Sequence, residues 1–460
     1  MSRAAALRYL DRALVAPPDE RAVPLLLGPV AGRDTALADA GLDRATWSAA
    51  RRAWVAHADR LTRALRWVDP LADHGGWTVT VKDTIDVAGM PTSLGHAVHR
   101  HHPAVTADAA TRLREIGLSV VGKAYATELN IGPPDQALNP AFPDLSPGGS
   151  STGSAVSVAA GISDFALATD VLGSARWPAA NCGIAGLRVS WHPARLAGVL
   201  PVSPTQDSIG LMARTVEDLR LLWLRAPVAP LPHRGRTGRP VVATVRNVAS
   251  AAPPMAGAQE RVVDVLRDLG FTVREIELPE AMWSARELAW ELCAADVAEV
   301  VAETEARLRM TISATARASL REAVTAGRHR ELHDAQREFR AAMPTFLDKT
   351  GVDVMLLPVS PSPPKRVVDR AGRPTLPKPA DADYTDRIGY TPIASFAGMP
   401  ALVLPAVVDD ELGPLAVQFV GRAGGEGTLL DLGVAVEHRL GVSATIAARV
   451  ATTLTGRWPC

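Results

Sequence analysis

Two serines and one lysine are the residues of this chain whose types and settings could perform nucleophilic chemistry. Ser150 lies within a glycine- and serine-rich run at 146–154, and Ser174 lies in a second turn of small residues at 169–178. Lys82 closes an apolar run upstream of both. A serine hydroxyl becomes a strong nucleophile when a neighbouring base accepts its proton, and an uncharged lysine can be that base. These residue types therefore indicate a serine hydrolase with a lysine base.

The lysine must lose its charge to act in this way. A lysine in water has a pKa of about 10.4, and burial lowers that pKa because it disfavours the charged form. Residues 77–82 alternate in polarity and are β-branched, which predicts a strand that ends at Lys82. Either the side chain is buried there, or it reaches solvent as most lysines at strand ends do. The chain has only five lysines among its 49 basic residues, and the arginines cannot serve as bases.

The serine- and glycine-rich run has three alternative interpretations. A flexible linker would be flanked by polar sequence, whereas apolar residues follow at 155–160 and 165–168. A phosphate-binding loop would end in Gly-Lys-Ser/Thr, and Gly153-Ser154 lacks the lysine. The segment 149–153 fits the G-x-S-x-G turn of α/β-hydrolases, but that turn follows a strand and 144–148 does not resemble one. An embedded, functional turn is the favoured interpretation.

Two other motifs are weaker indicators of function than the two serine turns and Lys82. Ser362 and Lys365 match an S-x-x-K pair, but the two prolines between them oppose the helical turn that such a pair needs. Histidines at 96, 99, 101 and 102 could suggest a metal, yet no Cys, Asp or Glu stands at ligand spacing except the more distant Asp108. We interpret this segment as a solvated loop or a pocket rim, and we expect no metal site.

Strands and helices are expected to alternate along the chain. Hydrophobic periodicity predicts one or two helices over 35–67 and further helices at 109–116, 153–161, 258–269 and through 280–348. Strands are predicted at 77–82, 119–123, 165–169, 241–245, 271–278 and 352–358, with a turn or helix at 124–130. This alternation predicts an α/β sandwich with a largely parallel sheet. Residues 226–240 form a Pro/Gly/Arg connector, and the Pro-rich segment 358–385 is predicted to be an irregular loop over a pocket.

Composition narrows the function classes. The 460 residues are 47% hydrophobic and 21% charged with a net charge of zero, so neither nucleic acid nor a membrane is indicated as a partner. The three cysteines are scattered and odd in number, which opposes a disulfide framework and favours a reducing cytoplasm. Charged residues interrupt the apolar N-terminus too often for a secretory signal peptide. No apolar run is long enough for a membrane-spanning helix. We therefore expect a cytoplasmic protein.

The chain resembles the amidase signature family over about residues 70–225 and 350–440. The motifs that carry the resemblance occur in the family's order: Lys82-Asp83 with Gly89, Thr92 and Gly95; Gly122-Lys123; Gly148-Gly149-Ser150-Ser151 with Gly153-Ser154; Thr169-Asp170, Gly173-Ser174, Arg176 and Pro178-Ala179; Gly183 and Gly186-Leu187; Asp207 to Asp218; Thr391-Pro392 to Pro405; and Val417 to Arg422.

The resemblance implies a fold and a set of roles. The fold would be an α/β/α sandwich around a large mixed sheet, with no metal or organic cofactor. Ser174 would be the nucleophile, and Ser150, held by a cis peptide, would bridge it to Lys82. For this chain we expect an N-terminal helical segment at 1–69 packed on a single domain at 70–460, which carries a helical insertion at about 280–348.

The turn before the nucleophile would supply supporting groups. Backbone N–H groups of Val171, Leu172, Gly173 and Ser174 would form the oxyanion hole. We expect Ser151, Asp170 and Arg176 to give structural support. Leu172 replaces a glycine of the family pattern, and it would be strained at positive φ or would instead form a wall of the acyl pocket. Thr152 replaces another glycine, and Gln206 replaces a commonly apolar residue.

The leading hypothesis is an amidase that hydrolyses a carboxamide C–N bond through an acyl-enzyme on Ser174, using a Lys82–Ser150–Ser174 relay. The alternatives are an acyl-transferring or tailoring enzyme or an esterase with the same triad, and a non-catalytic subunit. The expected partner is a small-molecule amide, and a homodimer is an analogy only. Loops near 96–102, 125–145 and 360–390 are expected to shape the pocket.

Overall fold

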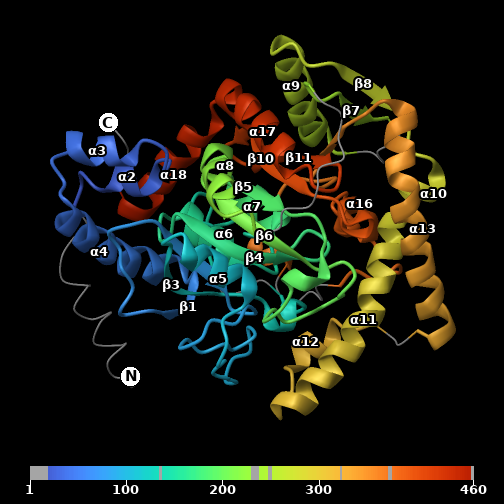
Figure 1. Cartoon of the computed structure of the whole chain (residues 1–460), viewed down its shortest axis with the longest axis horizontal. Helices are drawn as coiled ribbons and strands as arrows, with labels where there is room; N and C mark the ends of the chain where they lie inside the picture. The colour runs from blue at the N-terminus through green and yellow to red at the C-terminus, as the bar shows by residue number, and fades with distance from the viewer. Residues whose placement is uncertain are drawn as a thin grey trace.

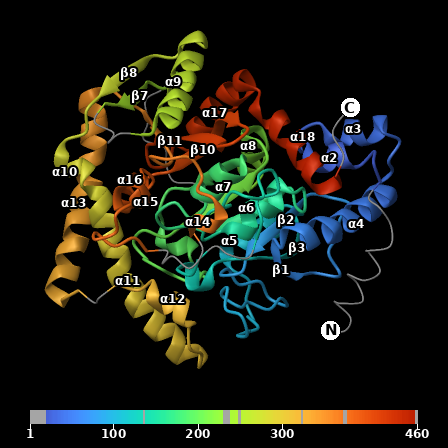
Figure 2. The same ribbon diagram turned by 180° about the vertical axis from the view of Figure 1, so that it is seen from behind.

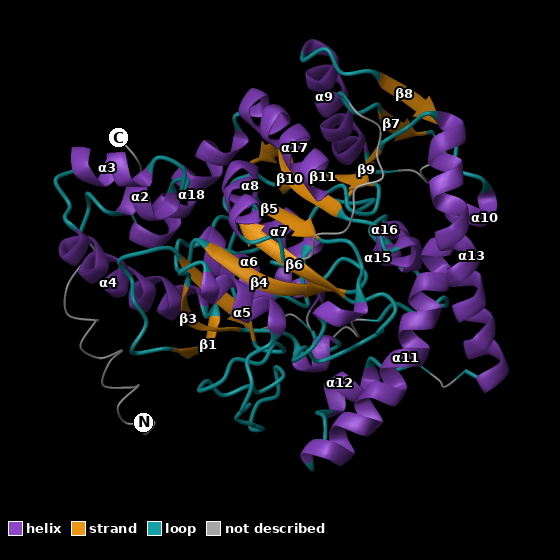
Figure 3. Cartoon of the chain, in the orientation of Figure 1, coloured by secondary structure: helices purple, strands orange, loops and turns teal. Residues whose placement is uncertain are grey.

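A single mixed sheet passes through the centre of the protein (Figures 1 and 3). The computed structural model describes residues 19–133, 137–228, 238–246, 251–321, 324–370 and 376–456. These residues form eleven strands in the order β1-β3-β2-β4-β6-β5-β10-β11-β9-β7-β8. The strands are β1 Leu65–Val68, β2 Thr78–Lys82, β3 Ser119–Ala124, β4 Phe165–Asp170, β5 Ala185–Arg188, β6 Ser208–Ala213, β7 Val242–Val245, β8 Val273–Ile276, β9 Val354–Pro358, β10 Ala401–Asp409 and β11 Gly413–Gly421.

Strand direction confirms the mixed sheet that the resemblance implied and corrects the largely parallel sheet expected from alternation. β2 pairs in parallel with β3 and β4, and β7 pairs in parallel with β8 and β9. The remaining neighbours are antiparallel. The expectation failed because β1, β5, β6, β10 and β11 were not predicted. Each antiparallel pair includes at least one of these five strands.

Helices cover both faces of the sheet (Figures 1 and 2). Leu402 and Val403 are consecutive in β10 and point to opposite faces. Leu402 lies beneath α17, where it approaches Gly433, and Val403 packs with Ala180 of α7. The larger helices are α4 Arg44–Thr62, α5 Asp108–Glu115, α6 Thr152–Ala159, α7 Arg176–Cys182, α8 Val216–Arg225, α9 Pro253–Asp268, α11 Ala285–Leu308, α13 Ala326–Thr350, α17 Glu426–Leu440 and α18 Val442–Thr455. The α/β/α architecture is therefore present.

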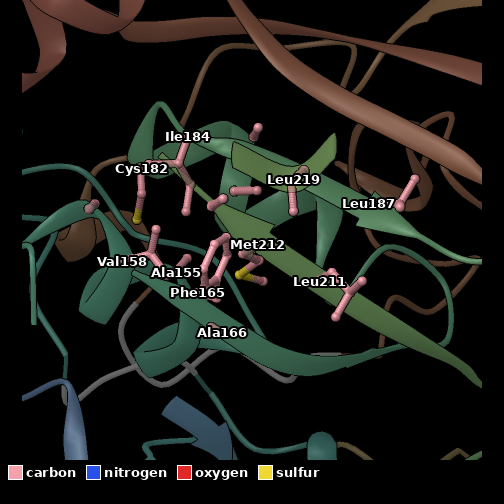
Figure 4. Packing of buried hydrophobic residues seen from close by; sticks show 14 of the residues in the cluster. Ala155, Val158, Phe165, Ala166, Cys182, Ile184, Leu187, Leu211, Met212 and Leu219 are labelled. Atoms are coloured by element: carbon pink, nitrogen blue, oxygen red, sulfur yellow. The ribbon is translucent and has the colours of Figure 1, made fainter. Parts of the chain in front are cut away.

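The core beneath α6 and α7 is built from small and branched apolar side chains. Figure 4 shows part of it, where residues of α6, β4, β5, β6 and α8 interdigitate with the end of α7 and the turn that follows it: Ala155, Val158, Phe165, Ala166, Cys182, Ile184, Leu187, Leu211, Met212 and Leu219. Two glycines let α7 lie against the sheet. A Cβ at Gly186 would come within 2.6 Å of the Ala179 side chain, and one at Gly210 within 2.5 Å of Ala175. This close contact fixes α7, whose first turn follows directly on Ser174.

The N-terminal region is mostly helical, as expected. The predicted helices over 35–67 are α3 Arg33–Asp39 and α4, and α2 Val23–Leu27 precedes them. The prediction was wrong at its end, because α4 stops at Thr62 and residues 65–68 form β1 at the edge of the sheet. Arg63 takes φ 54°, a left-handed conformation that ends the helix. The division of the chain at residue 69 stays a prediction.

The other elements expected from the sequence match the structure closely. Residues 280–348 form α10 Glu280–Trp283, α11, α12 Ala314–Ala318 and α13, and α11 and α13 lie side by side at one edge in both views (Figures 1 and 2). The described parts of 358–385, which are 358–370 and 376–385, are mainly irregular, with short helices α14 Val367–Arg370 and α15 Tyr384–Ile388. Most of the 226–240 connector lies outside the described residues. No described helix is long and apolar enough to cross a membrane.

Candidate active site

Three loops at one edge of the sheet bring Lys82, Ser150 and Ser174 to the same cavity. Lys82 ends β2, and Ser174 lies in the turn between β4 and α7. Because β2 and β4 are parallel neighbours, their carboxyl ends lie together. Ser150 follows a cis Gly149–Ser150 peptide just before α6. Ser150 and Ser174 both line the cavity, and Lys82 is buried behind Ser150.

Hydrogen bonds connect most of this set. Lys82 Nζ donates to Ser150 Oγ and to Thr169 Oγ1, each at 2.8 Å, and Ser150 Oγ donates to Asn130 Oδ1 at 3.2 Å. The Ser151 amide donates to the Ser174 carbonyl at 3.2 Å, which holds the two serine turns together. No hydrogen bond joins the Ser150 and Ser174 hydroxyls within the described part of the chain. Ser174 is partly exposed and lines the cavity.

Burial makes Lys82 a plausible base at neutral pH. Removal from water lowers the pKa of its ammonium group to about 7, although Asp170 and Asp207 favour the charged form. Thr169, the second partner of Nζ, was not identified from the sequence. Its hydroxyl and that of Ser150 satisfy the amine without placing a carboxylate in contact with it. A substantial fraction of the amine is therefore uncharged near pH 7.

Asp170 organises the turn that carries Ser174. Its carboxylate pairs with Arg176 at 2.8 Å and with Arg188 at 3.1 Å, and all three side chains are fully buried. Burial opposes ionisation of Asp170, but the two guanidinium groups hold its pKa far below the usual range. The carboxylate also accepts the amides of Gly173 and Ala175. The support expected of Asp170 and Arg176 fits these contacts, and Arg188 is an additional partner.

Replacing Asp170 is expected to destabilise the protein strongly. Asp170→Asn keeps the shape but leaves Arg176 and Arg188 without their buried counter-charge. Breaking a buried pair in this way costs about 3–5 kcal/mol. Urea denaturation followed by circular dichroism measures the free energy of unfolding. Asp431→Asn, which breaks an exposed pair with Arg220, is the control and should cost under about 1 kcal/mol. Equal effects from the two variants would contradict this role of Asp170.

The backbone of the turn offers fewer N–H donors for the oxyanion hole than the four that were expected. The Gly173 amide donates to Asp170 Oδ1 at 3.0 Å and is therefore occupied. The amides of Val171, Leu172 and Ser174 have no acceptor among the described residues. Leu172 does not take positive φ, so the strain considered for it is absent, and Gly173 takes φ 120° instead. Leu172 is buried and lines the cavity, as the alternative expectation stated.

Gly173 is expected to tolerate no side chain. A Cβ there would lie 2.4 Å from Trp177 Cδ1 and 2.5 Å from Thr391 Oγ1, at a φ that favours glycine. Gly173→Ala should shift the Leu172 and Ser174 amides and lower kcat by about 10²–10³-fold, the cost of losing one oxyanion donor. Gly427→Ala, in a helix with open space around it, should leave kcat unchanged. Turnover of Gly173→Ala within twofold of wild type would contradict this role of Gly173.

The other two departures from the family pattern have structural partners. Thr152 Oγ1 donates to the Gly148 carbonyl at 2.7 Å and closes the loop before α6. Gln206 Nε2 donates to Ser203 Oγ at 3.0 Å and to the Ala289 carbonyl at 3.1 Å. Ser151 Oγ donates to the Thr169 carbonyl at 3.1 Å, in line with its expected supporting role. These bonds fix the loops around the cavity.

The cavity has a volume of about 330 Å³, which suits a small molecule. Its lining combines apolar residues, polar residues around the two serines, and charged residues of the 358–388 segment: Val171, Leu172, Trp177, Val202, Trp290, Cys293 and Leu376 are apolar, and Lys365, Asp369, Asp383, Asp386 and Arg387 are charged. The contribution expected from residues 360–390 is thus present. Among the described residues of 125–145, Asn130 alone lines the cavity. The 96–102 loop turns toward Thr311 and Arg66 instead.

Two further lysines have partners other than the two serines of this site. Lys365 lines the cavity and pairs with Asp386 at 2.8 Å. Lys123 is a second buried lysine, and burial lowers its pKa to about 8, but it donates to the Ile85 carbonyl and Thr92 rather than to a serine. The described cysteines, Cys182 and Cys293, are free and buried. Cys460 lies outside the described residues.

The sequence pattern of the Amidase family matches residues 45–430, and the chain belongs to this amidase signature family. A glutamyl-tRNA(Gln) amidotransferase subunit of Thermus thermophilus is 30% identical over 427 residues, which cover 83% of this chain and 88% of that protein. Family membership supports amidase-type hydrolysis of a C–N bond.

Solved structures share the whole architecture. A 6-aminohexanoate cyclic dimer hydrolase has a TM-score of 0.79 at 20% identity, with 91% of this chain and 98% of that chain covered. The peptide amidase of Stenotrophomonas maltophilia has a TM-score of 0.72 at 23% identity, with the same coverage. Both likenesses establish the fold.

Proposed function

We propose that this protein hydrolyses a carboxamide through an acyl-enzyme on Ser174. The observation that carries the proposal is the 2.8 Å contact between a buried Lys82 Nζ and Ser150 Oγ at the wall of the cavity that Ser174 also lines. Uncharged Lys82 accepts the Ser150 proton, and Ser150 accepts the proton of Ser174. For this relay, the Ser150 hydroxyl must break its hydrogen bond to Asn130 and rotate toward Ser174. A bound substrate would favour this rotation because it excludes water from the cavity.

The reaction then proceeds in two halves. Ser174 Oγ attacks the carbonyl carbon, and the negative charge that develops on the oxygen is stabilised by the amides of Leu172 and Ser174. The C–N bond breaks, and the proton held by Ser150 and Lys82 passes to the leaving nitrogen. Water attacks the ester, gives its proton to the same pair of residues, and releases the carboxylic acid and Ser174. Asp170 and Arg176 hold the turn and transfer no proton.

The cavity suggests the class of substrate. Trp177, Trp290 and Leu172 favour an apolar or aromatic acyl group of modest size. Lys365 and Asp386 form an ion pair at 2.8 Å. Because their charges cancel, this pair gives little preference for substrates with a charged leaving group. We therefore propose small aryl or alkyl carboxamides as substrates, acted on without a metal or organic cofactor.

The test is a panel of amides that differ in acyl size, assayed for ammonia or amine release. Turnover of at least one apolar acyl amide, with labelling of Ser174 by a fluorophosphonate probe, is the expected result. An absence of both would overturn the proposal and favour a non-catalytic subunit. Preference for esters with no amide cleavage would favour an esterase.

Acyl transfer is the second candidate, because a relative with 30% identity is named as an amidotransferase subunit. In this reaction an amine or alcohol, instead of water, attacks the ester on Ser174. Product analysis with added hydroxylamine separates the two reactions. A hydroxamate as the main product supports transfer, and carboxylic acid alone supports hydrolysis. Gel filtration of the same sample tests the homodimer.

A further inference from the structure

A second cluster of chemically capable side chains lies between α11 and α13. His329 and His333 stand one helical turn apart on α13, and Asp296 faces them from α11. His329 Nε2 lies 2.6 Å from Asp296 Oδ1, and His333 Nε2 lies 3.6 Å from the same oxygen. The three ligand atoms all lie within 4.8 Å of one another. Two imidazoles and one carboxylate make up a common set of protein ligands for zinc, with a further position left to water.

The geometry points to a binding site for a divalent transition metal, Zn²⁺ being the probe, formed by Asp296, His329 and His333. Ligand atoms about 2.0–2.1 Å from a tetrahedral Zn²⁺ stand about 3.3 Å apart. The His333 separation already matches, and His329 needs to move from Asp296 by well under 1 Å. A metal also requires the two imidazole nitrogens, which lie within 4.8 Å of each other, to stand about 3.3 Å apart, and rotation of the partly exposed rings allows this adjustment.

Neighbouring groups hold these ligands as outer partners hold ligands in known metal sites. Ser203 Oγ donates to the other oxygen of Asp296 at 2.5 Å. Glu299 Oε1 lies 3.7 Å from His329 Nδ1, where it can accept the proton of that nitrogen when Nε2 binds metal. Asp296 is buried while His329 and His333 are partly exposed, so an ion can enter from solvent. Two carboxylates beside two imidazoles favour a cation.

The site would brace one wall of the catalytic cavity. Cys293 precedes Asp296 by one turn of α11, and Val202 precedes Ser203, and both line the cavity. A bound metal joins α11 to α13 and, through Ser203, to the loop beside the cavity. This role is structural and is independent of the proposed hydrolysis.

The other histidine cluster provides an internal control. His101 pairs with Asp86 at 3.0 Å, and His96 contacts the Thr311 carbonyl at 3.1 Å. These two rings are directed to different partners and converge on no common point with His99. A metal bound at the surface of that loop would be lost on substitution of His99, whereas the proposed site would not change.

Calorimetric titration of the chelator-treated full-length protein with Zn²⁺ tests the proposal. One saturable site is expected, with a Zn²⁺-dependent rise in Tm and visible absorption bands when Co²⁺ replaces Zn²⁺. His333→Gln should weaken binding by at least about 100-fold, and Ser203→Ala by about 10–100-fold, as outer partners do elsewhere. His99→Gln should leave the dissociation constant unchanged.

His333 is partly exposed, so its substitution is expected to remove a metal ligand without preventing folding. Circular dichroism of the metal-free His333→Gln variant, which lacks one partly exposed ring, tests that it folds. If His333→Gln and Ser203→Ala both bind Zn²⁺ as wild type does, or if wild type shows no saturable binding, the proposed site is overturned. Loss of binding in His99→Gln would assign the ion to the other cluster and would overturn it equally.

Discussion

Ser174→Ala is expected to lower amide turnover by about 10⁴-fold or more, because removal of a serine nucleophile eliminates the covalent route. Ammonia or amine release with the best amide of the panel measures the loss. The fluorophosphonate adduct, located by mass spectrometry, should disappear in the same variant. The fold should be retained, since the Ser174 hydroxyl makes no hydrogen bond within the described residues.

Ser154→Ala is the matched control for this prediction. Ser154 is a buried serine of α6 whose hydroxyl has no partner among the described residues. Its replacement should leave both turnover and labelling close to wild type. Full activity in Ser174→Ala would remove the proposed mechanism, and loss of labelling in Ser154→Ala would show that the probe responds to packing instead of the nucleophile.

Lys82→Met is expected to lower kcat/KM by about 10²–10⁴-fold, the usual contribution of a general base. In the wild-type protein kcat/KM should rise as pH passes through about 7, because burial lowers the pKa of Lys82 to about 7 and only the uncharged amine accepts a proton. The variant should lose this rise. Initial rates across pH 5–9 measure it, and Lys349→Met, at an exposed position on α13, should preserve it.

The same substitution has an opposite effect on stability. The folded pKa of Lys82 lies below the value of about 10.4 in an unfolded chain, so the unfolded state binds more protons between pH 7 and 10. The free energy of unfolding therefore increases with pH in that window, and the cost of burying the amine is greatest below pH 7. Lys82→Met should be more stable than wild type at pH 7 and show a shallower increase. The slope that remains is expected from Lys123.

The three residues that the structure brings together could be singled out from the sequence because their motifs are local. Ser150 and Ser174 stand in turns of small residues, and Lys82 ends a recognisable strand. Thr169 and Asn130 could not be predicted as partners, since their roles depend on strand order. β2 lies between β3 and β4 in the sheet, so Lys82 meets a residue of a strand that is second after it in the chain.

Strands of the antiparallel part were harder to predict. β5 and β6 consist largely of small or mixed residues that gain strand geometry only from their neighbours on the sheet. Arg188 could not be predicted as a partner of Asp170 either, because it lies on β5, which was itself not predicted. The cluster of Asp296, His329 and His333 escaped notice because its carboxylate comes from another helix, although a His-x-x-x-His spacing was the signal that could have found it.

α7 packs closely on Gly186 and Gly210, and this contact positions Ser174. The residues that position the nucleophile are therefore different from those that contact the acyl group of a substrate. Mutations beneath the nucleophile would displace it, so laboratory evolution toward new amides should fail there. Part of the cavity lining comes instead from Trp290 and Cys293 of α11 and from the 358–388 segment, which lie outside the turn that carries Ser174. Exchanging these two pieces between relatives should transfer preference for the acyl group while leaving the reaction itself in place.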